Sequence, residues 1–364
     1  MNDSQAHSQA HAPPPVHVPF RVVERVVPSA DPVVCPASPV PALASIGALG
    51  APAMHPEVDA VQERTIEWAY RFMLIVDDET STLLRRVRFV ELAAGSCSRA
   101  PARDLALLND WITWLFFHDD WFCDGVGSSV ARDPTRLAAL HKRLLEILAG
   151  ARPDSDEGPL SHALSDLRYR LARRMGGGWL PRFTRGVRAY FQSNLWEIQT
   201  RNAGRAPSIP AYLKMRAYSG AVHTAFDFLD VTAGGMIPAE LREHAVLQQL
   251  ALMANNCICW VNDIFSYPKE IQEGHATNLV LLLQRERGLA VDDAVARAVE
   301  LHNEELRAFL ELERELPRFN HKLSPAALAY VEGMRAWMFG NLAWSRETAR
   351  YQQCVNMKNW AEDP

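Results

Sequence analysis

Apolar side chains recur with a helical period along most of this chain, from Pro56 onward. In the first such stretch Val61, Thr65, Trp68 and Phe72 fall on one face of an expected helix of about 20 residues. No convincing run alternates apolar and polar residues with the period of two that marks a β-strand. The pattern therefore predicts an all-α fold, a bundle of helices around one core.

Further segments of the chain carry the same period. Asp104 is expected to cap one of the resulting helices, and Ser324 followed by Pro325 has the chemistry of an N-cap and a first-turn proline. The central segment is apolar on nearly all sides until it reaches Asn262, which predicts a buried helix whose polar end needs partners. The expected helices span residues 82–95, 104–122, 132–149, 160–174, 181–203, 210–231, 238–272, 289–315 and 325–352.

The N-terminal stretch has a different composition. Eleven of the 23 prolines fall within the first 56 residues, among Ala, Val, His and Ser and without helical periodicity. Residues 1–55 are therefore expected to form a disordered tail. Valine pairs at 22–23 and 26–27 leave open that a short part of it docks on the helical body. Residues 56–355 are expected to form a single domain, and residues 356–364 a C-terminal tail.

Charge and cysteine content exclude several classes of protein. A formal net charge of -5 gives no basic surplus to neutralise a phosphate backbone, so no nucleic-acid partner is expected. No signal-peptide pattern opens the chain, and no segment approaches about 18 uninterrupted apolar residues, so no membrane span is expected. Six cysteines are scattered without the spacing of a zinc site. We expect reduced thiols in a cytoplasmic protein.

An acidic motif ends one apolar, aromatic helix. Residues 115–124 read LFFHDDWFCD and contain Asp119, Asp120 and Asp124. On a helix Asp120 and Asp124 share a face, whereas Asp119 points about 100° away from Asp120, so neighbouring aspartates can serve different partners. Carboxylate oxygens suit Mg²⁺, which also shares substrate phosphate oxygens. The alternative is an acidic helix end that is solvated or paired with arginines.

A second motif follows at the end of the central helix, where residues 262–270 read NDIFSYPKE. Asn262, Ser266 and Glu270 recur every four residues and share one helical face, so their oxygens can chelate one ion. Lys269 lies on an adjacent face as a possible phosphate contact. The alternative is an ordinary helix end, with Asp263 and Lys269 in water.

Together the two motifs, DDxxxD and NDxxSxxxE, resemble the aspartate-rich and NSE magnesium motifs of microbial class I terpene synthases. The resemblance covers about residues 55–355 and implies the class I terpenoid synthase helical bundle as a single catalytic domain. It further implies an enzyme that ionises a linear prenyl diphosphate with Mg²⁺ and cyclises the cation to a terpene hydrocarbon or alcohol. One departure is the third residue between Asp120 and Asp124, where two are commonest, which weakens Asp124 as a metal ligand.

Other parts of the chain resemble the same family. Arg216 lies 46 residues before Asn262, the position of the family's diphosphate-sensing arginine. A helix break is expected just after it, at Gly220, with Ser219 in a linker position where aspartate is frequent. Near the C-terminus, Arg350 and Tyr351 resemble the family's RY pair.

The resemblance implies a role for each of these residues. Three Mg²⁺ ions are expected, two held by Asp119 and the third by the Asn262, Ser266 and Glu270 row. The diphosphate is expected to bind Arg216 and the side chains of Lys269, Arg350 and Tyr351. Asp120, a further metal-ligand candidate, is expected to pair with Arg350 or Arg216 when substrate closes the site. The cation is expected to meet an aromatic wall made by Phe116, Phe117 and Trp344, with Phe226 a weaker candidate.

Two other kinds of protein were considered, and each would require sequence features that this chain does not have. A chain-elongating prenyl synthase normally has a second aspartate-rich motif, and none follows residue 262. A non-catalytic helical binding protein would be expected to have lost some of these side chains, and none is lost. Farnesyl diphosphate is the favoured substrate by family and size; ten-carbon, methylated ten-carbon and twenty-carbon diphosphates stay open. A homodimer is a further possibility by resemblance.

Overall fold

The structure, a computed structural model, describes residues 43, 54–123, 129–176, 178–232, 236–275, 277–319, 325–352 and 354. All of them belong to one unit that extends from Val33 to Pro364. No β-strand occurs among them, so the all-α prediction is confirmed. Nearly all of the proline-rich tail, residues 356–364, Ser324 and Asp124 lie outside the described residues.

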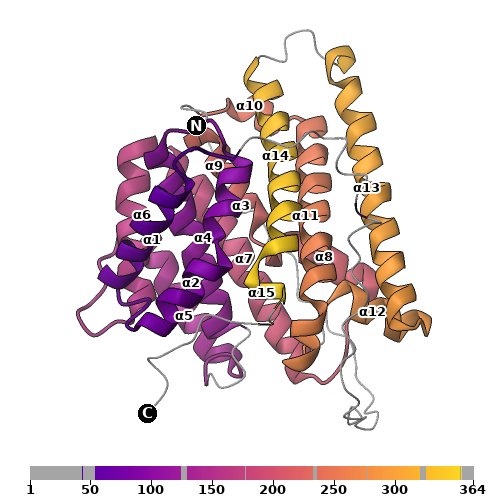
Figure 1. The fold of residues 1–364 in the computed structure, drawn as a ribbon, viewed down its shortest axis with the longest axis horizontal. Helices are drawn as coiled ribbons and strands as arrows, with labels where there is room; N and C mark the ends of the chain where they lie inside the picture. Colours follow the sequence, from indigo (N-terminus) through magenta and orange to yellow (C-terminus); the bar gives the residue numbers. More distant parts are fainter. Residues whose placement is uncertain are drawn as a thin grey trace, which may run out of the picture. The chain divides into compact units, whose positions relative to one another are not determined.

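The helices follow the expected order, but several expected helices are divided and one helix was not expected (Figure 1). They are α1 (Val58–Arg71), α2 (Asp78–Val87), α3 (Phe89–Ser96), α4 (Ala102–Phe122), α5 (Pro134–Ala149), α6 (Pro159–Met175), α7 (Trp179–Asn202), α8 (Ile209–Ser219), α9 (Val222–Thr232), α10 (Ala239–Arg242), α11 (Ala245–Gln272), α12 (Leu279–Arg287), α13 (Val291–Phe319), α14 (Pro325–Glu347) and α15 (Ala349–Gln352).

The expected helix 82–95 is two helices, because Arg88 adopts a left-handed conformation with φ +52°. Buried residues continue on both sides of it, so the apolar period does not reveal the break. The expectation for Asp104 was also wrong. Pro101 occupies the cap of α4, and Asp104 lies in the first turn, where both its oxygens accept hydrogen bonds from Arg174 at 2.8 and 2.9 Å.

Two other boundaries were missed near the central helix. The expected helix 238–272 divides into α10 and α11, and α12 was not expected at all. Asn278 caps α12 by accepting the backbone N–H of Val280 at 2.8 Å, and Gly288 ends it with φ +66°. An asparagine before an apolar run and a glycine after it are recognisable helix signals.

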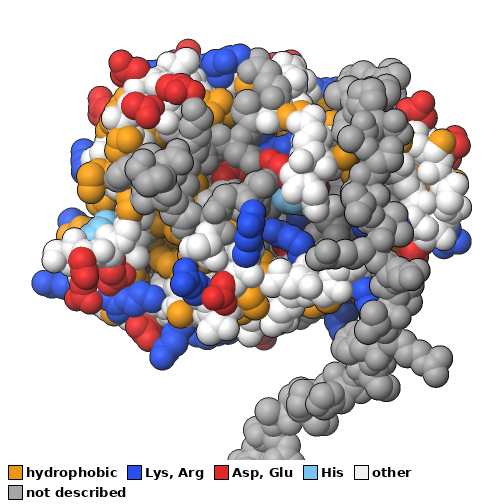
Figure 2. Space-filling model, turned by 90° about the horizontal axis from the view of Figure 1, so that it is seen from below, with side chains coloured by type: hydrophobic (Ala, Val, Ile, Leu, Met, Phe, Trp, Pro, Cys, Tyr) orange, Lys and Arg blue, Asp and Glu red, His pale blue; other side chains and the backbone are white. Residues whose placement is uncertain are grey.

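Helix α11 packs against α8, α9, α12, α13 and α14 (Figure 1). Its buried residues include Leu247, Leu250, Ile258 and Val261, as the sequence predicted. None of the helices in the described part of the chain combines the length and apolarity needed to cross a membrane. Seen from below (Figure 2), Lys and Arg side chains gather near the middle of the face but are interrupted by acidic and apolar ones.

Helices α3 and α14 approach each other through two glycines. A Cβ atom added at Gly95 would lie 3.0 Å from the Cα atom of Gly340, and one added at Gly340 would lie 3.1 Å from backbone atoms at Gly95 and Ser96. Both obstacles are main chain, which cannot rotate away. The contact therefore sets how close α14, with its row of tryptophans, lies to the rest of the bundle.

We expect Gly340→Ala to lower the free energy of unfolding by about 1–3 kcal/mol, because the added methyl group forces two helix backbones apart. Urea unfolding followed by circular dichroism measures this effect. The matched control is Gly178→Ala, whose Cβ would have no atom within 4 Å and whose φ is ordinary for an L-residue. Equal stability of the two variants would contradict the tight contact.

Burial lowers the pKa of His302 on α13 to about 4, and its Nε2 atom has no hydrogen-bond partner in the described residues. Between pH 6.5 and 4 the unfolded chain binds a proton at this histidine that the folded chain does not. Stability is therefore lost as the pH falls, by roughly 1.4 kcal/mol per pH unit for this group. We expect His302→Leu to reduce that slope in unfolding experiments from pH 7 to 4; an unchanged slope would contradict the assignment.

Candidate active site

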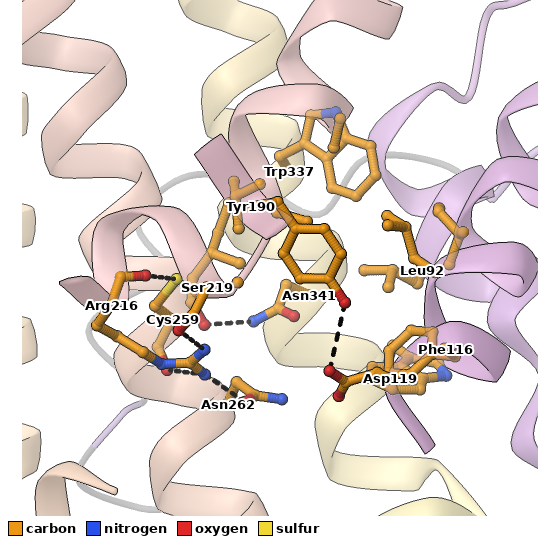
Figure 3. A pocket seen from close by; sticks show the side chains of 18 residues that line it. Leu92, Phe116, Asp119, Tyr190, Arg216, Ser219, Cys259, Asn262, Trp337 and Asn341 are labelled. Carbon is orange, nitrogen blue, oxygen red and sulfur yellow. Dashed lines mark hydrogen bonds between the residues drawn. The ribbon is translucent and has the colours of Figure 1, made fainter. Parts of the chain in front are cut away.

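A cavity lies among α3, α4, α7, α8, α9, α11 and α14 (Figure 3). Asp119, Arg216 and Asn262 lie at one end of it, and Trp337 lies at the other. Most side chains between the two ends are apolar. The cavity thus presents charged and polar groups at one end and an apolar space beyond them, an arrangement that suits a ligand with an anionic head and a hydrocarbon body.

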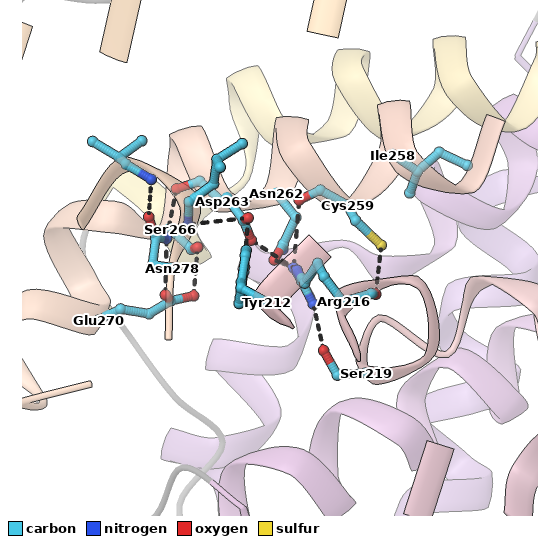
Figure 4. A network of polar contacts seen from close by, with 12 residues as sticks. Tyr212, Arg216, Ser219, Ile258, Cys259, Asn262, Asp263, Ser266, Glu270 and Asn278 are labelled. Carbon is cyan, nitrogen blue, oxygen red and sulfur yellow. Dashed lines mark hydrogen bonds and ion pairs between the residues drawn. The ribbon is translucent and has the colours of Figure 1, made fainter. Parts of the chain in front are cut away.

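Arg216 is the most connected group at the polar end. Its Nε atom donates to Asp263 Oδ1 at 2.8 Å, Nη1 donates to Ser219 Oγ at 3.3 Å, and Nη2 donates to Asn262 Oδ1 (Figure 4). The bond to Ser219 is long for a hydrogen bond, and the bond to Asp263 is the shorter one. Asp263 had no role in the interpretation favoured from the sequence, and only the alternative placed it, in water.

Asp263 is almost fully buried in α11. Burial raises its pKa to about 6, although the charge of Arg216 and the hydroxyl of Tyr212, which donates at 2.6 Å, act in the opposite direction. The side chain adjoins the Asn262 motif but faces α8. The sequence could have indicated this ion pair, because a carboxylate on a helix that is otherwise buried needs a cation as its partner.

The helix break was predicted correctly: α8 ends at Ser219 and α9 begins at Val222. Glycine is needed at this break for close packing and not for a left-handed backbone conformation. Gly220 has an ordinary φ of -73°, and the left-handed residue is Ala221, with φ +53°. A Cβ atom at Gly220 would lie 2.5 Å from Cys259 Sγ, so glycine is needed there for close approach to α11.

The expected row on α11 is bound into one network (Figure 4). Ser266 Oγ donates to Glu270 Oε1 at 2.6 Å, and Glu270 Oε2 accepts from Asn278 Nδ2 at 2.9 Å. Asn262 donates to the hydroxyl of Tyr351. Asn278 was missed by the sequence analysis; it joins the cap of α12 to the glutamate of this row.

Asp119 and Asp120 point to different partners, as expected for neighbours on a helix. Asp119 lines the cavity and accepts a hydrogen bond from Tyr190 at 3.3 Å. Asp120 is buried, and its two oxygens accept from Arg350 at 2.6 and 2.8 Å. Of the two roles considered for Asp120, this geometry favours the anchor for Arg350 over the metal ligand, and it favours Arg350 over Arg216 as its partner.

The remaining diphosphate candidates do not line the cavity directly. Lys269 is buried and contacts Glu273 at 3.0 Å, one turn along α11. Tyr351 lies behind the lining, where it accepts a hydrogen bond from Asn262 and packs edge-on against Trp344. Burial raises the pKa of Tyr351 to about 12, against the opposing charges of Arg350 and Lys269, so its hydroxyl keeps its proton near neutral pH.

The aromatic wall differs from the expectation. Phe117 packs fully buried against Trp121, and Phe226 is also buried in the core; neither lines the cavity, because each faces away from it on its helix. Phe116 does line it, and its ring is also packed by groups outside the lining: Phe89 stacks on it at 4.1 Å, and the guanidinium of Arg350 lies over it at 4.7 Å.

Two tryptophans of α14 supply the other aromatic surface. Trp344 lines the cavity as expected, and its indole N–H donates to the carbonyl of Val87 at 2.8 Å, which fixes the ring. Trp337, two turns earlier, lines the far end and was not expected. Trp337 and Trp344 are seven residues apart, which places both on one helical face. This spacing could have identified Trp337 as a second wall residue from the sequence.

Tyr190 on α7 connects the acidic motif with two buried histidines. Its hydroxyl lies 3.3 Å from Asp119 Oδ1 and 3.2 Å from His118 Nδ1, and His118 Nε2 lies 3.1 Å from His141 Nε2. Burial lowers the pKa of His118 to about 3 and that of His141 to about 2, so both are neutral. No local motif marks Tyr190, which is 71 residues away from Asp119 in the sequence.

The candidate metal-ligand oxygens suit a hard divalent cation, although only Asp119 and Asn262 line the cavity, and Ser266 and Glu270 lie farther along α11. Within the described residues no three His, Cys, Asp or Glu side chains gather at one point. The candidate oxygens instead come from mixed groups, with the Ser266 hydroxyl 2.6 Å from Glu270 and the Asn262 amide one turn earlier. Such sets suit Mg²⁺, which takes few protein ligands and fills its shell with water and phosphate oxygens.

The contact between Gly220 and Cys259 gives a testable coupling. We expect Gly220→Ala alone to lower the melting temperature, because the new Cβ meets the sulfur. In the Cys259→Ala background the same change is expected to cost less, with a coupling energy of about 1 kcal/mol or more. Thermal unfolding of the wild type, both single variants and the double variant measures it; additive effects would contradict the contact.

The chain was compared with known proteins. A family model described as "Terpene synthase family 2, C-terminal metal binding" matches residues 110–308. The chain is 40% identical over 299 residues to a (+)-T-muurolol synthase, (2E,6E)-farnesyl diphosphate cyclizing, of Roseiflexus castenholzii, covering 82% of this chain and 90% of that protein. It is 32% identical to a germacrene A synthase of Nostoc punctiforme, covering 83% and 92%.

The fold comparison agrees with the sequence comparison. A solved structure of a cucumene synthase variant superposes with a TM-score of 0.72 and 29% identity, covering 82% of this chain and 97% of that one. The residues matched by the family model, 110–308, include Asp119 and the row of Asn262, Ser266 and Glu270. On these grounds the chain belongs to the terpene synthase family.

Proposed function

We propose that this enzyme ionises farnesyl diphosphate with the help of Mg²⁺ and cyclises the resulting cation to a sesquiterpene, with release of diphosphate. The observation that carries the proposal is the cavity itself, in which Asp119, Arg216 and Asn262 lie at one end of an otherwise largely apolar space. The similarity to a farnesyl-diphosphate-cyclising relative supports the chain length. The catalytic unit is proposed to comprise residues 56–355.

The polar end is proposed to bind the diphosphate group. Three Mg²⁺ ions are proposed, with Asp119 as the ligand of two and Asn262, Ser266 and Glu270 as the ligands of the third. When bound, Mg²⁺ would neutralise the phosphate oxygens and make diphosphate a better leaving group. Arg216 would add charge-assisted hydrogen bonds from the guanidinium nitrogens that already face Asn262 and Ser219.

A second group of residues is proposed to close the polar end. Arg350 is held by Asp120, and Tyr351 beside it bonds to Asn262, so α15 is attached to both motifs at once. A diphosphate that displaces the Asn262 contacts would act directly on α15. Lys269 and Arg350 would then supply further positive charge, and closure would exclude water from the reactive cation.

The apolar part of the cavity is proposed to hold the hydrocarbon chain. Trp344 and Trp337 present the aromatic surface, and an aromatic face attracts a desolvated cation by about 2 kcal/mol. The helix break at Gly220 adds backbone carbonyl dipoles near the polar end. Together these groups stabilise positive charge without offering it a strong nucleophile.

The first experiment is incubation of the purified full chain with geranyl, farnesyl and geranylgeranyl diphosphate, with Mg²⁺ or with EDTA. We expect a Mg²⁺-dependent cyclic terpene from farnesyl diphosphate, detected by gas chromatography and mass spectrometry. A product from another chain length would correct the substrate. No terpene from any of the three, with diphosphate unreleased, would contradict the proposed function.

Asp119→Asn tests the proposed metal ligand. Losing one carboxylate at the polar end is expected to lower turnover by about a hundredfold or more and to raise the Mg²⁺ concentration for half-maximal rate. The control is Asp293→Asn, which removes an exposed carboxylate in the first turn of α13. Diphosphate release measured across a Mg²⁺ titration separates the two; an unchanged Mg²⁺ requirement in Asp119→Asn would argue against the assignment.

A further inference from the structure

The middle of the cavity contains a polar side chain to which the proposed function gives no role. Asn341 on α14 lines the cavity and is only 5% exposed. It lies one turn after Trp337 and one turn before Trp344, on the helical face that both tryptophans share. In Figure 3 it lies between the end formed by Asp119 and Asn262 and the end formed by Trp337.

One hydrogen bond determines how the Asn341 amide is turned. Its Nδ2 atom donates to the carbonyl oxygen of Ile258 on α11 at 3.2 Å. A carbonyl oxygen only accepts, so the NH₂ group must face it and Oδ1 must face the cavity. Oδ1 has no hydrogen-bond partner among the residues that the structure describes, and no dashed line reaches it in Figure 3. An acceptor that faces the cavity without a protein partner is free to interact with a ligand there.

The surroundings of Asn341 in the cavity are largely apolar. The hydroxyls of Ser219 and Tyr190, which also lie on the cavity wall, are bonded to Arg216 and Asp119. Asn341 Oδ1 is therefore a fixed partial negative charge that faces a largely apolar space.

We propose that Asn341 Oδ1 directs the cyclisation, by stabilising positive charge on carbon atoms that pass through the middle of the cavity. This inference rests on the proposed function. The amide dipole is already oriented by Ile258, so it needs no reorganisation as the charge arrives. No bond to Asn341 forms or breaks. Because Asn341 lies beyond the polar end where diphosphate is proposed to leave, it acts on the cation rearrangements that follow ionisation more than on ionisation itself.

Asn341→Leu tests this role in the full chain with farnesyl diphosphate and Mg²⁺. We expect kcat/KM for diphosphate release to stay within about threefold of the wild type. The share of the main product is expected to fall by about half or more, replaced by acyclic and early-cyclised terpenes. The melting temperature is expected to change little, because the side chain loses only the 3.2 Å bond from Nδ2 to Ile258.

The matched control is Ser345→Ala. Ser345 lies one turn after Asn341 on the same helix, is equally buried, and has an unpaired Oγ atom in the described structure, but it does not line the cavity. We expect this variant to keep the wild-type product distribution. Asn341→Ala is the second variant if the leucine does not fold, with the same expected change in products.

Several outcomes would overturn the inference. If Asn341→Leu gave the wild-type product distribution and a lower melting temperature, Asn341 would serve only as a structural contact between α14 and α11. Selective loss of an alcohol that carries ¹⁸O from labelled water in the wild type would show that Asn341 holds a water. Absence of any terpene from the wild type would instead contradict the proposed function, and with it this inference.

Discussion

The buried ion pair between Arg216 and Asp263 determines the geometry of the polar end. A carboxylate inside a helical core is tolerated only when its charge and its oxygens are both matched. Here Arg216 supplies the charge, while the Tyr212 hydroxyl and the backbone N–H of Leu279 supply further hydrogen bonds. The pair thereby joins α8, α11 and the start of α12. Removing one partner from such a pair typically costs about 3–5 kcal/mol, because the other charge stays buried.

The same arginine connects the polar end to the helix break. Arg216 uses Nε for Asp263, which leaves its two terminal nitrogens for Ser219 and for Asn262, a candidate metal ligand. Its backbone carbonyl accepts from Cys259 Sγ at 3.5 Å, the same sulfur that touches Gly220. An anion that attracts the guanidinium therefore pulls on the residues that form the break. Binding at the polar end and geometry at the break are parts of one network.

A periodic pattern contains local information. Asn262, Ser266 and Glu270 were placed together on α11 because local spacing decides which side chains share a helical face. Asp263 and Asn278 were missed because their roles depend on partners in other helices. Phe117 was misplaced since both it and Phe116 are apolar, and only the rotation of α4 decides which one faces the cavity. Arg88 broke a helix without interrupting its apolar pattern.

The Phe116 ring already has a cationic partner within the protein. An aromatic face is negative and its edge is positive, so the orientation of a ring decides whether it attracts a cation. The guanidinium of Arg350 lies over the Phe116 ring, on which Phe89 also stacks, so Phe116 helps to hold an arginine that Asp120 also binds. Trp344 and Trp337 line the cavity from α14 as well, and Asn341 lies between these two tryptophans on the same helix.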